Sequence, residues 1–289
     1  MRTTVVSYVA MACATCYLTG RTTCLDGYRM EWLLQHMRVT ASLMIREMST
    51  RFGNKPGGYV WALIDPLAHV GFMSIIFQAI ARVPALGSSF ALFFASGYLP
   101  FLFYSSVASF INGAIKANRA LLSYPIVAPF DVVVSRYIVQ VLTTSLVAFL
   151  VLCLVTIEDH ISFFGVMDIG HVAAACITAT LIGLGVGVAN IALFARSSLY
   201  EKIFGVVTRP MFLLSGVLFI PENMPHPFGD ILLYNPLTHA IILFRSGIYP
   251  EYRATGLDTD YLLECTAAVL FVGASVFTMS ARQLREEKL

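Results

Sequence analysis

The sequence predicts an all-α polytopic membrane protein with six transmembrane helices. Of its 289 residues, 57% are apolar and only 12% are charged, which is about half the charged share of a soluble domain. The mean hydropathy of +0.75 exceeds what one soluble core of this size can supply. Beyond residue 58 the apolar residues form long runs that can cross a bilayer, and short polar segments separate them.

The distribution of charge divides the chain into three regions. Residues 1–30 are predicted to be a poorly structured tail or to lie upstream of the true start. Residues 31–57 mix apolar residues with arginines and predict an amphipathic helix on the membrane surface, ended by a Pro-Gly-Gly break. Residues 58–289 form the predicted transmembrane domain. Tyr59 and Trp61 at its start are residue types that sit at headgroup level.

Six apolar runs give the predicted transmembrane spans, which are 58–81, 90–112, 131–157, 169–194, 203–220 and 261–279. The segment between the last two is apolar enough to enter the bilayer but is too broken by proline to cross it. Two half-helices that meet at Asn235 and Pro236 are one interpretation. A cap outside the membrane with no ligand is the other.

The basic residues predict the orientation in the membrane. With both termini inside, fifteen lysines and arginines fall in inside segments, three fall outside, and Arg209 lies within a span. Cytoplasmic loops carry such an excess, so we expect a multi-pass protein with both termini in the cytoplasm. The net charge of +2 and the lack of a basic tract give no reason to expect nucleic acid as a partner.

No catalytic or nucleotide-binding pattern is present in the sequence. We find no GxxxxGK[ST] motif and no Ser/His/Asp or Cys/His set with a plausible shared location. Cys13 and Cys16 form a CxxC that no second pair completes, so we expect neither a metal nor a cofactor on this chain. Any ATP-driven work must come from another polypeptide.

Two further patterns each leave two readings open. A short helix at 114–123 would present Lys116 and Arg119 near two leucines, either to dock on a cytoplasmic partner or as an ordinary connector. The aromatic residues of the second span suit sugar rings, but they also suit helix packing. Asp65 and His69 share a helix face, which keeps a proton-coupled transporter among the alternatives.

The stretch REMSTRFGNKPGGYVWALIDPL at 46–67 resembles the entry segment of ABC-2 type permeases that export capsular polysaccharide or O antigen. That family typically reads RE, TRFG and GYxWALxEP, and Asp65 stands where glutamate is usual. The element NPLTH at 235–239, followed by Arg245, resembles NPLxHxIExxR of the capsule (KpsM-like) branch, although Ile242 replaces a common acidic residue. The segment 121–129 is more loosely similar to the family's cytoplasmic coupling region.

The resemblance covers residues 40–289 and implies the fold and partners of an ABC-2 (type V) exporter. Such permeases form homodimers in the bacterial inner membrane and bind two copies of a separate ATP-binding subunit, which holds ATP and Mg. Each protomer supplies six spans and an amphipathic helix at the cytoplasmic entrance. A lipid-linked polysaccharide passes between the protomers, re-entrant helices cap the outer side, and periplasmic and outer-membrane export proteins are further partners.

We therefore predict a non-catalytic permease subunit that exports lipid-linked capsular polysaccharide through a homodimeric channel. The alternatives are an ABC-2 permease for O antigen, teichoic acid, lipid or drug, and an ion-coupled secondary transporter. The resemblance implies three groups of site residues. They are the substrate entrance and channel (Arg46, Arg51, Tyr59, Trp61, Tyr98, Phe101, Tyr104), the contact with the ATPase (Lys116, Arg119, Leu121, Leu122, Pro125) and the outer re-entrant cap (Asn235, Pro236, His239, Arg245).

Overall fold

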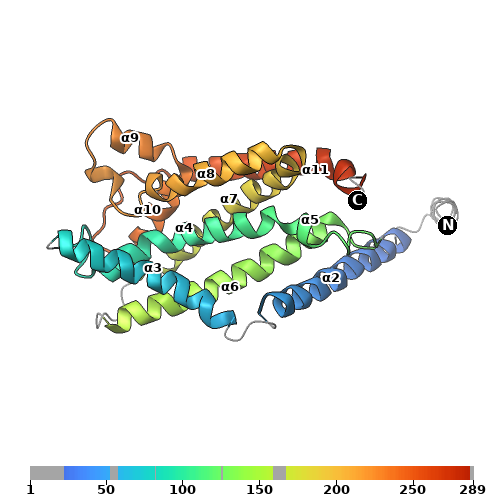
Figure 1. The fold of residues 1–289 in the computed structure, drawn as a ribbon, viewed down its shortest axis with the longest axis horizontal. Coiled ribbons are helices and arrows are strands. Elements are labelled where there is room, and N and C mark those ends of the chain that lie inside the picture. The colour runs from blue at the N-terminus through green and yellow to red at the C-terminus, as the bar shows by residue number, and fades with distance from the viewer. Residues whose placement is uncertain (1–22, 53–57, 82, 125, 159–166, 287–289) are drawn as a thin grey trace.

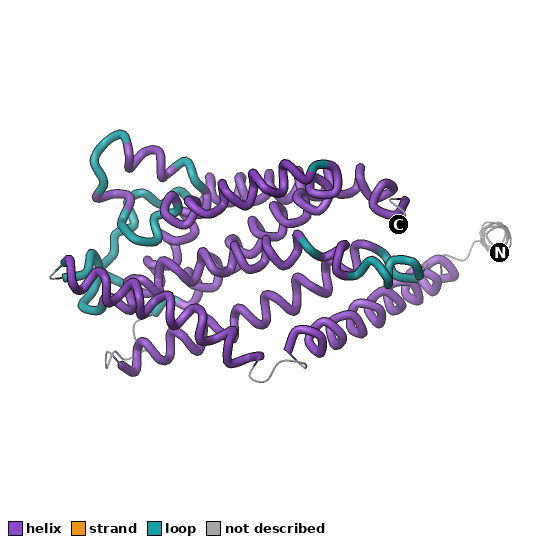
Figure 2. The backbone as a smooth tube through the Cα atoms, viewed as in Figure 1, coloured by secondary structure: helices purple, strands orange, loops and turns teal. Residues whose placement is uncertain are grey.

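The computed structural model describes the chain over residues 23–52, 58–81, 83–124, 126–158 and 167–286. Within these ranges every regular element is a helix (Figure 2), as the sequence predicts. Cys13, Cys16 and Pro125 lie outside the described residues, and Tyr59 is described only in its backbone.

The helices carry the labels of Figure 1. They are α2 (Thr23–Phe52), α3 (Gly58–Ile80), α4 (Phe90–Asn112), α5 (Ala114–Ala117), α6 (Pro129–Glu158), α7 (Ile169–Arg196), α8 (Ser198–Leu214), the 3-10 turn η1 (Pro221–Asn223), α9 (Phe228–Leu233), α10 (Pro236–Ile248) and α11 (Thr259–Glu286).

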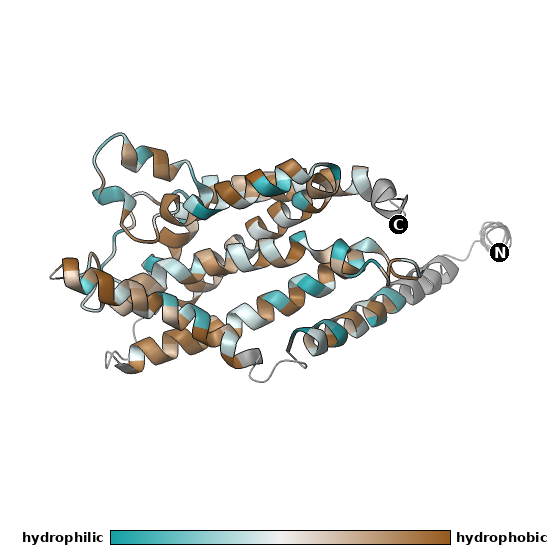
Figure 3. Cartoon of the chain, in the orientation of Figure 1, coloured by the Kyte–Doolittle hydropathy of each residue, from teal (hydrophilic) through white to brown (hydrophobic). Residues whose placement is uncertain are grey.

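Five of the described helices are long and apolar enough to cross a membrane. They are α3, α4, α6, α7 and α11, and they match the predicted first, second, third, fourth and sixth spans. Hydrophobic residues dominate α3 and α6 in Figure 3, whereas α2 alternates between hydrophilic and hydrophobic residues. The long apolar runs of the sequence therefore correspond to long helices.

The predicted fifth span at 203–220 differs from the structure. Helix α8 begins earlier, where the Ser197 hydroxyl accepts a hydrogen bond from the Tyr200 amide at 3.3 Å, and it ends at Leu214. Gly216 then adopts a φ of +72°, a left-handed conformation that stops a helix. With 17 residues, α8 is about 26 Å long, which is shorter than the usual transmembrane helix.

Helices α4 and α7 form the centre of the bundle. Of the membrane-length stretch of α4, 67% is buried inside the bundle, whereas the corresponding share for α3 is 17%. Helix α7 packs on α4, α10 and α11, and it approaches α4 closely because Gly183 has no side chain. A Cβ at Gly183 would lie 2.6 Å from the Tyr104 carbonyl oxygen. The α7 glycines thus permit backbone-to-backbone packing of the kind common in membrane helices.

The bundle has two distinct ends (Figure 1). Helices α9 and α10 lie at one end, while the start of α2, α5 and the last turns of α11 lie at the other. The segments predicted to be cytoplasmic therefore share one end of the molecule, opposite the predicted outer cap.

Helix α2 is a single 30-residue helix that packs along α6. It begins at Thr23, within the region 1–30 that the sequence predicts as a tail. Polar side-chain contacts join its described part to the bundle, among them His36 to Asp131, Arg46 to Asn118, Glu47 to Arg136 and Arg51 to Gln140. The helix is therefore held by polar contacts with protein as well as by its apolar residues.

Candidate functional site

A groove of about 610 Å³ runs between α8 on one side and α3 and α4 on the other. Helix α8 rests on α7 and leaves this space open toward α4. The lining residues are His69, Tyr98, Phe101, Tyr104, Ser105, Ala108, Ser109, Asn112, Phe194, Glu201, Phe204, Gly205, Thr208, Arg209 and Phe212.

Aromatic rings close the groove toward the end of the bundle that carries α9 and α10. The His69 imidazole stacks on Tyr98, with ring centroids 4.4 Å apart and planes 19° apart. Phe212 of α8 meets His69 and Phe101 edge-on, at 5.2 and 5.4 Å between centroids. These ring contacts help to bring α3, α4 and α8 together, and the groove wall presents flat ring faces.

Polar groups are interleaved with the rings. Ser105, Ser109 and Asn112 of α4 lie one helical turn apart along the groove wall. Asn112 Oδ1 and His69 Nε2 are buried without a hydrogen-bond partner in the described part of the chain. A wall of ring faces and hydroxyls can stack on a sugar ring and hydrogen-bond its hydroxyls.

The structure brings three of the predicted channel residues together. Tyr98, Phe101 and Tyr104 occupy one face of α4 at helical spacing, and all three line the groove. The sequence analysis missed the opposite wall, because the inward face of α8 depends on its packing against α7. The spacing of Ser105, Ser109 and Asn112 from Tyr98 was a signal that could have found the polar half of the α4 face.

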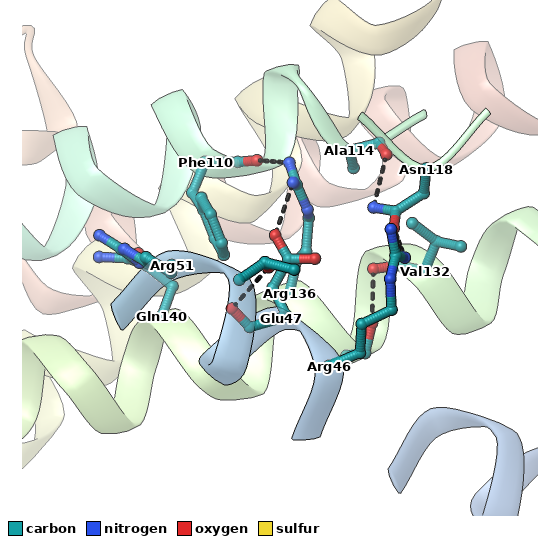
Figure 4. A network of polar contacts seen from close by, with 11 residues as sticks. Arg46, Glu47, Arg51, Phe110, Ala114, Asn118, Val132, Arg136 and Gln140 are labelled. Carbon is teal, nitrogen blue, oxygen red and sulfur yellow. Dashed lines mark hydrogen bonds and ion pairs between the residues drawn. The ribbon is translucent and has the colours of Figure 1, made fainter. Parts of the chain in front are cut away.

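The other predicted entrance residues lie elsewhere. Trp61 is on an exposed surface of α3, with 66% of its area accessible. Arg46 and Arg51 of α2 do not line the groove. Arg46 donates to Asn118 Oδ1 at 2.7 Å, and Arg51 donates to Gln140 Oε1 (Figure 4). Both arginines therefore join α2 to neighbouring segments of the bundle.

The predicted ATPase contact is shorter as a helix than the sequence indicates. Helix α5 is one turn, and the predicted helix at 114–123 continues as turns because Asn118 Nδ2 donates back to the Ala114 carbonyl. Lys116 and Arg119 are exposed, while Leu121 and Leu122 pack against the buried cluster beneath them. The segment thus presents a basic outer surface on an apolar base.

The predicted cap residues gather at the opposite end of the bundle. Asn235 caps α10, accepting from the Leu237 amide at 3.1 Å and donating to Ser215 Oγ at 3.1 Å. Pro236 is the first residue of α10, a position where proline costs no hydrogen bond. The break between α9 and α10 falls where the sequence predicts two half-helices to meet.

His239 and Arg245 complete the cluster around α10 at this end of the bundle. The Asp258 amide donates to His239 Nδ1 at 3.1 Å, so Nε2 carries the proton and donates to the Leu233 carbonyl at 2.8 Å. Arg245 is fully buried, and it donates to the Val217 carbonyl at 2.8 Å and the Phe219 carbonyl at 3.0 Å. These side chains tie the chain after α8 and the start of α11 to α10.

The chain is similar over most of its length to known transport proteins of the bacterial membrane. The chain is 28% identical to the polysialic acid transport protein KpsM of Escherichia coli over 82% of this chain and 91% of that protein. It is 23% identical to the capsule polysaccharide export inner-membrane protein CtrC of Neisseria meningitidis over 86% and 92% of the two chains. It is 24% identical to the corresponding protein BexB of Haemophilus influenzae over 82% and 88%.

The family model described as ABC-2 type transporter matches residues 38–249, which include the second half of α2, the groove and the cluster around α10. This match covers well over half of the chain. The protein belongs to the ABC-2 type transporter family.

Proposed function

We propose that this chain is the membrane-spanning permease subunit of an ATP-driven exporter that moves lipid-linked capsular polysaccharide across the bacterial inner membrane. The observation that carries the proposal is the groove between α4 and α8, which combines stacked rings with hydroxyl and amide groups. The similarity to three capsule export permeases over most of the chain supports the same substrate class.

The groove is half of the proposed channel. It is open on one side, so a second copy of the chain facing it would enclose a polymer between two similar walls. A homodimer also fits the repeating chemistry of a polysaccharide, because each wall then offers rings and hydroxyls to successive sugar units. Tyr98, Phe101 and Tyr104 are the proposed stacking residues.

The energy for export comes in this proposal from a separate ATP-binding subunit. The sequence has no GxxxxGK[ST] motif of its own, and in this proposal two copies of a cytoplasmic partner hold ATP and Mg, as the family resemblance implies. The exposed Lys116 and Arg119 beside the half-buried Leu121 and Leu122 form the proposed contact with that partner.

The proposed topology has six crossings, with α8 as a short fifth one and both termini in the cytoplasm. The excess of fifteen inside over three outside basic residues supports this orientation. Helix α2 lies at the cytoplasmic entrance. Helices α9 and α10 form the re-entrant cap, where periplasmic and outer-membrane export proteins would receive the polymer.

A deletion strain tests the proposed function. Cells that lack the gene should retain radiolabelled capsular polymer inside, and a plasmid copy should restore surface polymer. The purified chain should carry an ATP-binding protein with it, and the complex should hydrolyse ATP in a vanadate-sensitive manner. Unchanged capsule export in the deletion strain, or transport by the chain alone in proteoliposomes under an ion gradient, would contradict the proposal.

A further inference from the structure

The junction of α2, α4 and α6 places three charged side chains around one aromatic ring (Figure 4). The guanidinium carbons of Arg51 and Arg136 lie over the Phe110 ring, at 4.6 and 4.5 Å from its centroid. Glu47 pairs with Arg136 at 2.6 Å, and the side chains of this pair are only 11% and 8% exposed. Helix α2 contributes Glu47 and Arg51, α6 contributes Arg136, and α4 contributes the ring.

Hydrogen bonds extend the junction into α4. Arg136 Nη1 donates to the Phe110 carbonyl at 2.9 Å. A second route begins at Arg51, which donates to Gln140, and Gln140 Nε2 donates to Thr144 Oγ1 at 2.9 Å. The Thr144 hydroxyl lies 3.1 Å from that of Ser106 on α4. Helix α2 thus reaches both the backbone and the side chains of α4 through residues of α6.

The opposite face of the junction leads to the segment after α5. Arg46, the neighbour of Glu47, donates to Asn118 Oδ1 at 2.7 Å, and the Asn118 amide holds the Ala114 carbonyl at 3.1 Å. A displacement of the segment that carries Lys116 and Arg119 therefore pulls on α2.

Burial makes this junction move as one body. Separating a nearly dry ion pair leaves an uncompensated charge in the interior, which is strongly unfavourable. The ring adds two cation–π contacts that are strengthened by the loss of water. If α2 is displaced, moving α6 and α4 with it costs less free energy than separating Glu47 from Arg136.

Phe110 is next in sequence to a residue of the groove wall. Phe110 lies between Ser109 and Asn112 on α4, and both of these line the groove wall. A shift of α4 at Phe110 therefore changes the position of the polar groups that face the opening.

We propose that Phe110 is a positioning residue that transmits displacement of the cytoplasmic segment, through α2 and its arginine pair, to the groove wall on α4. This inference rests on the proposed function, since it assigns a route by which ATP hydrolysis in a partner opens the groove. Phe110 does not line the groove itself and acts through the helix that does.

The experiment compares two leucine substitutions on α4 in the full permease–ATPase complex. Phe110→Leu keeps apolar volume but removes the ring between the arginines, and Phe110→Tyr restores the ring. Phe103→Leu is the matched control, because Phe103 is 3% exposed on the same helix but lines an apolar cavity between α6 and α7. Surface polysaccharide and ATP hydrolysis are each measured per assembled complex.

We expect Phe110→Leu to lower export per complex by at least about fivefold, the low end of coupling between linked sites, while ATP hydrolysis stays near the wild-type rate. Phe110→Tyr and Phe103→Leu should export as wild type does. Equal export by both leucine variants overturns the inference, and so does a parallel fall in export and hydrolysis. If the wild-type complex exports no capsular polymer, the proposed function fails instead.

A double-mutant cycle separates coupling from simple destabilisation. Arg136→Lys keeps the charge beside Glu47 but loses the planar group that covers the ring. If the residues act as one unit, Arg136→Lys with Phe110→Leu should lower export no further than Phe110→Leu alone. Additive losses in export would show that the ring and the arginine act separately, and would contradict the inference.

Discussion

Gly185 of α7 and Gly273 of α11 lie backbone to backbone, so that a methyl group on Gly273 would overlap the Gly185 carbonyl group. This contact joins the last long helix to the centre of the bundle. We expect Gly273→Ala to destabilise the folded protein by about 1–3 kcal/mol, because overpacking forces the two backbones apart. Thermal unfolding in detergent, followed by size-exclusion chromatography, measures the change.

Gly71→Ala is the control for that substitution, since a Cβ at Gly71 of α3 would meet no atom within 4 Å. Alanine also favours a helix over glycine by about 1 kcal/mol, so this variant should unfold at the same temperature or higher. A Gly273→Ala protein as stable as Gly71→Ala would mean that α7 and α11 are not in such close contact.

The buried Arg245 predicts a second stability effect. Its replacement by alanine leaves the Val217 and Phe219 carbonyls without their donor, and each buried unsatisfied group costs about 1–3 kcal/mol. Arg245→Lys should be only partly tolerated, because a single ammonium lacks the planar fork. Arg253→Ala, at an exposed position, should stay within about 0.5 kcal/mol of wild type. Unfolding in denaturant gives the three values, and equal costs for Arg245→Ala and Arg253→Ala would contradict the structure.

Occlusion of the groove gives a functional prediction. Ser109 is exposed on the groove wall, so Ser109→Trp should fill the opening and abolish most polysaccharide export while the complex still assembles. Ser145→Trp is the matched control, because Ser145 is also exposed but faces the apolar cavity between α6 and α7. Polysaccharide export is measured for both variants in cells that contain equal amounts of the complex. Normal export with Ser109→Trp would place the polymer path elsewhere.

The end of the bundle that carries α9 and α10 holds a pH-dependent contact. His226 Nδ1 lies 2.7 Å from Asp230 Oδ2, and this hydrogen bond and charge raise the pKa of His226 above its usual 6.5. A raised folded-state pKa means that the contact contributes fully below pH 6.5 and is lost as the pH rises through the higher value. Both side chains are largely exposed, so the effect is local.

Hydrogen exchange of the α9 amides measures this effect. Exchange should accelerate as the pH rises through the His226 transition, after correction for intrinsic rates. Asp230→Asn should remove the pH dependence because the carboxylate that favours the imidazolium is gone. An unchanged pH profile in Asp230→Asn would show that the pair does not order α9.

The long apolar runs allowed five long helices to be predicted closely, but the predicted fifth span shows why composition alone is insufficient. The apolar run at 203–220 continues past Gly216, whereas the helix stops before it, because that residue adopts a positive φ. The short α5 has a similar origin, since the Asn118 side chain competes for a backbone carbonyl. Both features depend on local conformations that helix-forming composition does not reveal.

For the candidate site, the sequence predicts which residues share a helix face but not which distant residues they contact. Tyr98, Phe101 and Tyr104 follow from one helix and one spacing, so the sequence suffices to place them on a common face. Arg46 and Arg51 find partners 72 and 89 residues away in the chain. No periodicity encodes such pairing, so the sequence analysis did not predict that the two arginines contact Asn118 and Gln140.

The shortness of α8 has a consequence for the surrounding membrane. If α8 is the fifth crossing, as proposed above, its length of about 26 Å falls below the roughly 30 Å of bilayer hydrocarbon, and hydrophobic mismatch would thin the lipid beside it. Helix α8 is also one wall of the groove. In the proposed function, a lipid-linked sugar chain that leaves the bilayer at this wall would therefore cross less hydrocarbon than it would beside the longer helices.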